Sequence, residues 1–523
     1  MTKIRTYYCI GLIFLGFFLS QCTDLDLAPE DAATEDEVFS DAAAYRSYLA
    51  KVYGSFSLTG QDGPSGDGDI SIVNDEGFTS YIRVYWKAQE LTTDEAVIAW
   101  TDAGIRDLHE HSWSSENQFV RVLYYRIALI VSFANDFLKQ SSDEKLASNG
   151  ISAEDQEIIQ EYRLEARFLR ALAYWHALDF FRNVPLETEI SANIPSQASP
   201  LEVYNFIKDE LIDIESQLPD PGANEYGRAD KAAVWMLQAK LYLNAETMVG
   251  VDEYAACVEA CSKVINEGYT LEPIYQSLYM KDNHESNEII FAINSDGKNT
   301  QNWGNTTFLV HAAIGGTMVD SDYGVVNGWA GLRTTKDFVS KFPDMTGDID
   351  RRAIFYTDGQ SLEIDDIGVF EQGIAVPKYT NTNLAGEAGS DPTHVDTDYP
   401  LFRLGDAYLM YAEATLRGGG GDMNLALDYV NRLRERAYGS VNGNITSTDL
   451  NLDFILDERS RELYWEATRR IDLIRFGQFS DQGIWAWKGN VKEGRITESF
   501  RNIFPIPASD ILANPNLNQN PGY

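Results

Sequence analysis

Hydrophobic side chains recur along much of the chain at the spacing of an amphipathic helix. Residues 156–182 place an apolar side chain at each successive turn of one face, namely Phe168, Leu172, Trp175 and Leu178. Residues 115–139 and 451–475 follow the same period. The pattern therefore predicts three long helices.

Shorter helices are predicted in pairs, with start and stop signals between them. Residues 230–247 and 252–267 form one pair. Asp230 and Asp252 are suited to capping their first turns, and Gly268 to ending the second helix in the left-handed conformation.

Another pair spans residues 403–417 and 422–438, separated by four glycines at 418–421 that a helix interior would not carry. A further helix should begin near residue 199. Ser199 and Glu202 have the spacing of a capping box, and a proline between them stands at the first helical position.

Small side chains recur seven residues apart in these helices, at Ala166 and Ala173, Ala232 and Ala239, and Ala407 and Ala414. This spacing lets one helix nest closely against the next, as in tetratricopeptide repeats. We therefore expect a mainly α fold with a tetratricopeptide-like scaffold of helix pairs. Generic amphipathic hairpins are the alternative.

The remaining stretches are irregular and rich in Gly, Asn, Thr and Asp. The helical scaffold is expected to comprise residues 40–56, 115–281 and 401–480. The loop-rich region is expected to comprise residues 57–114 and 282–400, with a short strand at 288–293. Because binding sites concentrate in irregular segments held on a rigid scaffold, we expect the ligand there.

The N-terminus has the three parts of a secretory signal. Two basic residues precede about 14 apolar ones, and residues 19–22 read LSQC, which resembles a bacterial lipobox. This predicts a signal peptide over residues 1–21 and a mature chain 22–523, anchored by acyl groups on Cys22. An ordinary signal peptide with an incidental cysteine is the alternative.

The chain is strongly acidic, and this limits its partners. It has 80 acidic and 42 basic side chains, a net charge of −38. Removing residues 1–21 takes away Lys3 and Arg5 and no acids, so the mature chain carries 40 − 80 = −40. Such a surface repels nucleic acid, anionic membranes and anionic polysaccharides, which leaves neutral ligands. Outside the N-terminus only Cys257 and Cys261 remain, four apart on a predicted helix, and we expect them to be packing residues.

No catalytic motif stands out. A phosphate-binding loop, a Gly-x-Ser-x-Gly elbow and a dinucleotide fingerprint are absent from the sequence, and His284-Glu285 lacks the second histidine of a zinc-protease motif. We therefore expect no enzymatic activity and no required cofactor. The acidic and amide side chains around Asp282 and Glu285 offer oxygen ligands for calcium, although their spacing is not that of an EF-hand.

Two tryptophans lie beside amides and glycines in the irregular region. Trp303 follows Asn302, and Trp329 follows Asn327 after one glycine. An exposed indole stacks on the apolar face of a pyranose ring, while amides bind its hydroxyl groups. The pattern favours a carbohydrate site. The alternative is that the two indoles close a core under their loops.

Several segments resemble the SusD/RagB family. They are CTDLDL (22–27), QELTTDEAVIAW (89–100), LEARFLRALAYWHALDFF (164–181), GRADKAAVWMLQAKLYLNA (227–245), DERSRELYWEATRRIDLIRFGQF (457–479) and FPIPASDILANPNLNQNPGY (504–523). The family consists of glycan-binding lipoproteins of the Bacteroidetes outer surface. The resemblance implies a lipid-anchored protein at the outer-membrane surface, with acidic residues behind Cys22 as an export signal. It also implies a partner, a SusC-like TonB-dependent transporter.

In the family's starch-binding founding member, the ligand rests in an arc of aromatic side chains. By local context the resemblance carries an arginine over to Arg83 and two arc residues over to Trp303 and Trp329. A third arc position falls on Ile98, with Trp100 nearby. An asparagine position falls on Ala103, beside Asp102.

The resemblance thus implies a glycan site of Trp303, Trp329, Arg83, Trp100, Asp102, Asn302 and Asn327. The missing ring at Ile98 leaves two ligands open, an α-glucan such as starch and a β-1,3-glucan such as laminarin. Two other classes of function also stay open. One is a surface glycoside hydrolase, and the other is a protein-binding tetratricopeptide-type scaffold in which Trp303 and Trp329 would be buried.

Overall fold

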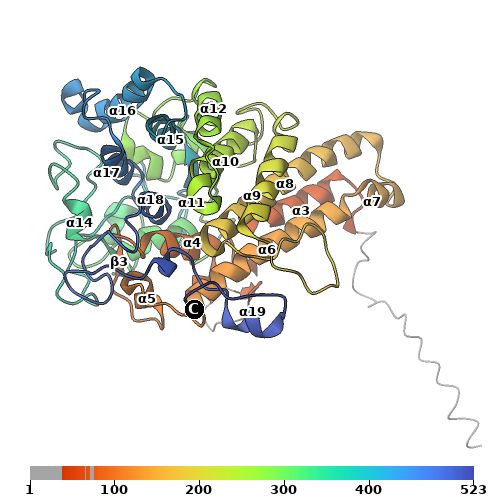
Figure 1. The fold of residues 1–523 in the computed structure, drawn as a ribbon, viewed down its shortest axis with the longest axis horizontal. Helices are drawn as coiled ribbons and strands as arrows, with labels where there is room; N and C mark the ends of the chain where they lie inside the picture. The colour runs from red at the N-terminus through yellow and green to blue at the C-terminus, as the bar shows by residue number, and fades with distance from the viewer. Residues whose placement is uncertain (1–37, 65, 71–75) are drawn as a thin grey trace, which may run out of the picture.

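The structure is a computed structural model that describes residues 38–64, 66–70 and 76–523 (Figure 1). The expected signal peptide and Cys22 lie outside the described residues. Within them, no helix combines the length and the apolar character that crossing a membrane requires.

The scaffold consists of helices that lie side by side in chain order. They are α3 (Ala42–Gly54), α6 (Gln118–Gln140), α7 (Asp143–Ser148), α8 (Ala153–Phe181), α9 (Pro200–Glu215), α10 (Lys231–Leu243), α11 (Ala245–Val249), α12 (Tyr254–Ile265), α15 (Leu404–Leu416), α16 (Met423–Tyr438), α17 (Leu452–Leu463) and α18 (Arg469–Arg475). Helices α3, α6 and α8 run together in the right half of Figure 1, and α10, α12, α15 and α16 pack in succession. The predicted mainly α fold is confirmed.

Most predicted helix starts are confirmed. Ser199 and Glu202 form a capping box at α9, and the Asp230 carboxylate accepts two backbone N–H groups at the start of α10. At α12 the prediction was one residue off, because Glu253 occupies the N-cap while Asp252 accepts the Tyr254 N–H at 3.1 Å.

The helix predicted over 451–475 is wrong as a single element, because the chain breaks between α17 and α18. Trp465 and Ala467 have φ angles of 61° and 57°, which no α-helix accommodates. The break turns the Trp465 indole into the core, where it meets the Trp86 ring edge-on at 5.3 Å. The Trp86 indole N–H donates to the Trp465 carbonyl at 3.0 Å. Burial of two large rings and this hydrogen bond outweigh helical periodicity here.

The part of the chain that the structure describes contains three antiparallel two-stranded ladders. They pair β1 (Gly60–Asp62) with β2 (Gly66–Gly68), β3 (Val97–Ile98) with β5 (Leu332–Arg333), and β4 (Ile289–Ile293) with β6 (Tyr399–Arg403). One of them, β4 with β6, connects the loop-rich region to the scaffold. The strand predicted at 288–293 is confirmed as β4.

The loop-rich region also contains helices that the sequence pattern did not predict. They are α4 (Tyr81–Glu90), α5 (Ile105–Glu110), α13 (Asn305–Ala312) and α14 (Lys336–Val339), and α19 (Ala508–Ala513) lies near the C-terminus. Every residue of α4 and of α13 is buried. The short helix α13 has no distinct polar face, so it leaves no amphipathic period to detect.

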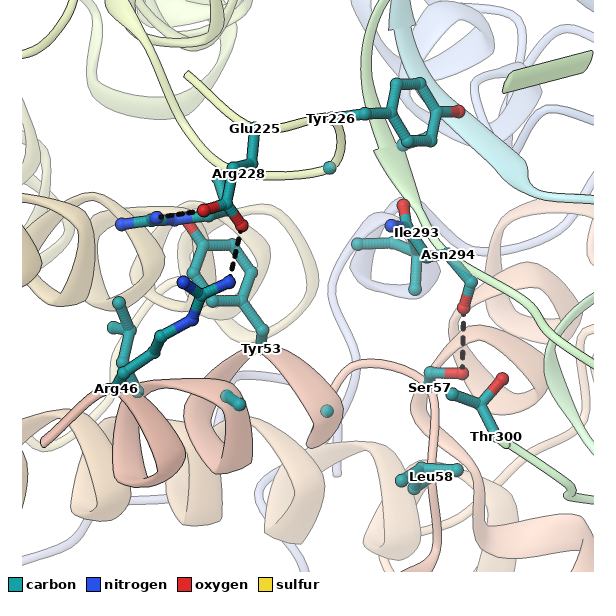
Figure 2. Close-up of a pocket in the computed structure, with 15 residues that line it drawn as sticks. Arg46, Tyr53, Ser57, Leu58, Glu225, Tyr226, Arg228, Ile293, Asn294 and Thr300 are labelled. Carbon is teal, nitrogen blue, oxygen red and sulfur yellow. Dashed lines mark hydrogen bonds and ion pairs between the residues drawn. The ribbon is translucent and has the colours of Figure 1, made fainter. Parts of the chain in front are cut away.

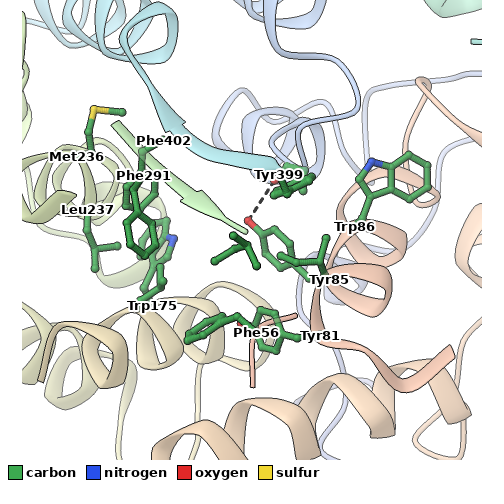
Figure 3. Close-up of a cluster of buried hydrophobic side chains, with 14 of the residues drawn as sticks. Phe56, Tyr81, Tyr85, Trp86, Trp175, Met236, Leu237, Phe291, Tyr399 and Phe402 are labelled. Carbon is green, nitrogen blue, oxygen red and sulfur yellow. Dashed lines mark hydrogen bonds between the residues drawn. The ribbon is translucent and has the colours of Figure 1, made fainter. Parts of the chain in front are cut away.

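The hydrophobic core joins the two regions. Figure 3 shows Tyr85 and Trp86 of α4 on one side and Trp175 of α8 with Phe291 of β4 on the other. Cys257 and Cys261 of α12 are buried free thiols, which confirms that they are packing residues.

Side chains of the segment DERSRELYWEATRR (457–470) form buried ion pairs that hold the elements around this core together. Glu458 accepts from Arg352, Arg434 and Arg461, and Glu462 accepts from Arg352, Arg403 and Arg436. Burial alone would raise the pKa of Glu462, but the charges of Arg436, Arg403 and Arg352 lower it to about 2. The motif therefore ties α17 to β6 and to the loop before it.

Candidate functional site

Three indoles from separate parts of the chain form one continuous row. Trp100 follows β3, Trp303 precedes α13, and Trp329 precedes β5. The ring centroids of Trp100 and Trp329 are 6.2 Å apart, and so are those of Trp303 and Trp329. Neighbouring rings are inclined by 46° and 52°, and all three are partly exposed. We call Trp100, Trp329 and Trp303 the tryptophan row.

Backbone pairing places Trp100 against Trp329. Strands β3 and β5 continue their ladder through the Ala99 N–H, which donates to the Gly331 carbonyl at 2.9 Å. The Trp100 indole N–H donates to the Trp329 carbonyl at 3.0 Å. A Cβ at Gly331 would lie 2.7 Å from the Trp100 ring, so only glycine lets the indole rest there.

His311 of α13 supports the central indole from behind. Its ring stacks on Trp329 at 4.8 Å and 21°, and its carbonyl accepts the Trp329 N–H at 2.7 Å. The two imidazole nitrogens lie 3.1 and 2.9 Å from the carbonyls of Asn327 and Thr393. Burial lowers the pKa of His311. His311 thus joins two loops under the row.

Asn302 holds the loop of Trp303 rather than facing solvent. Its side chain is 2% exposed, accepts the Gly304 N–H at 2.8 Å and donates to the Thr300 carbonyl at 2.9 Å. His394 lies 4.7 Å from the Trp303 ring and its Nδ1 is 3.1 Å from the Asn302 carbonyl. The geometry gives Asn302 a positioning role.

Two cations of α4 lie behind the row. The Arg83 guanidinium is 5.6 Å from the Trp100 ring and 5.9 Å from the Trp329 ring, and it donates to the Trp303 carbonyl at 2.7 Å. Lys87, one turn later, lies 5.8 Å from the Trp100 ring. Both side chains are buried. Their charges favour the electron-rich ring faces, so they stabilise the row from inside. A hydrogen bond from Arg83 to a glycan stays a prediction.

The remaining sequence-predicted residues lie at the edge of the row. Asp102 and Asn327 are exposed, Asn327 with a φ of 60° that asparagine tolerates. Ile98, where the family arc has a ring, is buried in β3 opposite Leu332. Trp100 instead supplies an indole next to Trp329.

Residues 366–523 match the model of the SusD family. The chain is also 34% identical to the starch-binding protein SusD of Bacteroides thetaiotaomicron, over 99% of both chains. This chain belongs to the SusD family. A second relative, SusD-like protein P2 of Formosa agariphila, is 24% identical over 99% of both chains.

Solved structures of the SusD superfamily share this fold. A SusD homolog from Bacteroides thetaiotaomicron has a TM-score of 0.73 at 19% identity and covers 95% of this chain and 100% of its own. Surface glycan-binding protein A from Bacteroides fluxus has a TM-score of 0.70 at 19% identity and covers 92% and 99%.

Membership of the SusD family does not by itself point to the residues that support the row in this chain. They are Lys87, His311, His394 and Phe308, whose ring lies 5.9 Å from the Trp100 ring. The one sequence signal for Lys87 is its position four residues after Arg83, which places both cations on one face of a helix. His394 is far from all three indoles in sequence, and His311 follows Trp303 closely but stacks on Trp329, so only the fold reveals these contacts.

Two buried carboxyl groups lie at the far end of α4. Glu90 accepts the Thr468 N–H at 3.2 Å, and Glu95 accepts the Ser460 hydroxyl at 2.6 Å. Burial raises the pKa of Glu95 to about 7, and burial together with Glu95 holds the pKa of Glu90 well above its usual range. From about pH 4.5 to 7 the folded chain therefore keeps protons that the unfolded chain has lost, so this pair weakens the fold as pH rises.

Asp282 precedes a single 3₁₀ turn, Asn283–Glu285, and Glu285 is the last residue of that turn. Among the described residues, no three His, Cys, Asp or Glu side chains group as metal ligands would. A calcium site built from these two carboxylates would need backbone or amide oxygens as well, and it stays a prediction.

Proposed function

We propose that this chain is a cell-surface lipoprotein that binds a neutral glucan on the tryptophan row and delivers it to a TonB-dependent transporter. The observation that carries the proposal is the row itself. The rings of Trp100 and Trp303 each lie 6.2 Å from the central Trp329 ring and are inclined to it, and all three indoles are partly exposed. The starch-binding function named for the relative that is 34% identical supports it.

The geometry favours a polymer of sugar rings that curves. Coplanar rings would suit a flat, extended chain, whereas rings inclined by 46° and 52° to their neighbour suit a chain whose sugar rings change orientation from one to the next. Both helical α-glucans and helical β-1,3-glucans present such a surface. The net charge of −38 disfavours sulfated and uronate polymers.

Affinity gel electrophoresis tests the ligand. The chain is run through gels that contain amylopectin, laminarin or no polysaccharide, beside a Trp303→Ala/Trp329→Ala variant. We expect one glucan to retard the wild type and to retard the variant much less. Equal mobility of the two proteins in every glucan gel would contradict the proposed site.

We propose further that the protein binds glucan without cleaving it. Incubation of the retarding glucan with the purified chain should release no reducing ends, and steady release would favour the hydrolase alternative. The protein-binding scaffold required buried Trp303 and Trp329, and their partial exposure favours the glycan function over it.

The anchor and the transporter are tested separately. Cys22→Ala should leave the chain soluble or as an uncleaved precursor, because acyl chains supply its membrane affinity. Mass spectrometry of the mature N-terminus finds the acyl groups, and an unmodified Cys22 would end the lipoprotein proposal. Pull-down from outer membranes in mild detergent should recover a TonB-dependent receptor. A chain that elutes alone would contradict delivery.

A further inference from the structure

A pocket with its own set of lining residues lies between α3, residues 225–228 and the end of β4. Its volume is about 300 Å³, at the lower end of the range of roughly 300–1,000 Å³ typical of small-molecule sites. Figure 2 shows Arg46 and Tyr53 of α3 on the left, Tyr226 at the top, and Asn294 and Thr300 on the right. None of the described residues that line it belongs to the tryptophan row.

One ring in this pocket is held so that its face stays accessible. Tyr226 lines the pocket and is 44% exposed. Its hydroxyl donates to the Asp398 carboxylate at 2.8 Å, so the ring is fixed at its far end. A fixed, exposed aromatic face is a stacking surface for an apolar ligand face.

The side-chain amide of Asn294 also lines this pocket. Asn294 directly follows β4 and is exposed, and its side chain makes no hydrogen bond to any other described residue, although its own carbonyl is bonded. A Cβ at Gly227 would lie 2.3 Å from this amide, so glycine is required there to leave room for it. An asparagine side chain offers two donors and one acceptor, the set that vicinal hydroxyl groups satisfy.

The charges around the pocket cancel in pairs. Arg46 bonds Glu225 at 2.7 Å, and Arg228 lies 3.6 Å from Glu225 and also pairs with Glu165. Since each of these cations already has a carboxylate beside it, an anionic or cationic ligand gains little from them. The pocket therefore favours a neutral ligand.

We infer that this pocket is a second carbohydrate site, which takes a single neutral pyranose ring or the end of an oligosaccharide. The ring face would stack on Tyr226 and its hydroxyls would bond the Asn294 amide. The inference rests on the proposed function for the kind of ligand but not for the location. Both rival glucans consist of glucose, so glucose itself is the probe.

Saturation-transfer difference NMR with glucose measures this site in the full mature chain. The background is the Trp303→Ala/Trp329→Ala variant, which removes the row and leaves the pocket intact. We expect this variant to keep a glucose signal. Adding Asn294→Ala should weaken glucose binding roughly 2- to 12-fold through loss of a hydrogen bond.

A second variant blocks the pocket without removing any polar contact. Gly54 ends α3 and lines the pocket, and a Cβ there would meet only Leu58 within 4 Å, at 3.7 Å. Gly54→Leu should therefore fill the space and abolish the signal. Asn193→Ala is the matched control, since Asn193 is exposed and lies outside the pocket lining. It should leave glucose binding unchanged.

The outcomes separate the two proposals. A row variant that gives no glucose signal overturns the second site, and so does a signal that survives both Asn294→Ala and Gly54→Leu. Neither result touches the retardation of the wild type in glucan gels. Conversely, if no glucan gel retards the wild type but a glucose signal that depends on Asn294 persists, the row is refuted and the pocket is supported.

Discussion

Replacing Trp329 by alanine is the most direct perturbation of the tryptophan row. Trp329 is the central ring, in contact with Trp100 and Trp303 on its flanks and with His311 behind. A sugar ring stacked on this indole buries an apolar area of about 40–80 Å², worth roughly 1–2 kcal/mol at about 25 cal/mol per Å². Its loss should weaken glucan binding about 5- to 30-fold.

The same substitution should cost only moderate stability. Trp329 is partly exposed, and the backbone carbonyl that accepts the Trp100 indole N–H remains in alanine. We therefore expect a loss of about 1–3 kcal/mol in the free energy of unfolding, less than the roughly 3–5 kcal/mol typical of a buried aromatic. The folded population at room temperature should hardly change, so an affinity loss reports the site.

The assay is isothermal titration with the glucan that retards the wild type, combined with thermal unfolding. Trp329→Phe keeps a ring and should bind between the wild type and Trp329→Ala. Trp487→Ala is the matched control, because Trp487 is also partly exposed but packs against Val97, Ile364 and Ile367 and contacts none of the three rings of the row. It should bind as the wild type does.

Two results would refute this reasoning. Unchanged affinity in Trp329→Ala would mean that the glucan rests elsewhere. A loss of affinity that tracks only the fraction of unfolded protein, with Trp329→Phe as damaging as Trp329→Ala, would mean that the indole is a core residue and not a stacking surface.

Three further predictions follow from contacts around the row and the scaffold. Gly331→Ala should displace the Trp100 indole and weaken glucan binding several-fold, with a changed tryptophan fluorescence; an unchanged spectrum and affinity would contradict the close contact. Glu90→Gln keeps one site of the Glu90–Glu95 pair neutral at every pH. The melting temperature of this variant should therefore rise relative to that of the wild type as pH increases from 5 to 8, and a difference in melting temperature that does not change with pH would refute the shared burial. Ser199→Ala removes a helix cap and should cost about 1 kcal/mol of unfolding free energy in denaturant titration, whereas a wild-type midpoint would show that the cap is dispensable.

The helical scaffold was largely predictable because the apolar period of an amphipathic helix and its capping residues can be seen in the local sequence. The face of 156–182, the capping box at Ser199 and the four glycines at 418–421 each act locally. Helix α9 begins where predicted, and α8, α15 and α16 begin and end within a few residues of the predicted limits. Long-range forces decided the exceptions. Trp465 breaks its helix because the indole gains a buried partner in Trp86, almost 400 residues away in sequence.

The candidate site was predictable only in part. Residue type and loop context pointed to Trp303 and Trp329, and family resemblance added Arg83 and the region of Trp100. The roles differ from the expectation in detail, since Arg83 lies behind the indoles and Asn302 inside its loop. Whether a polar side chain faces the ligand or the protein depends on the path of distant segments, which composition and spacing do not record.

The origin of the three indoles has a consequence for how specificity changes among such proteins. Each ring comes from a different segment, after β3, before α13 and before β5, while α4 and α13 supply a shared foundation beneath them. The Trp303 segment shares no strand pairing with the other two, whereas the Trp100 and Trp329 segments are joined by the β3–β5 ladder and by the Trp100 indole N–H. Ligand preference therefore divides into two exchangeable units, so chimaeras that swap the Trp303 loop alone, or the Trp100 and Trp329 segments together, should change the preferred sugar linkage one unit at a time.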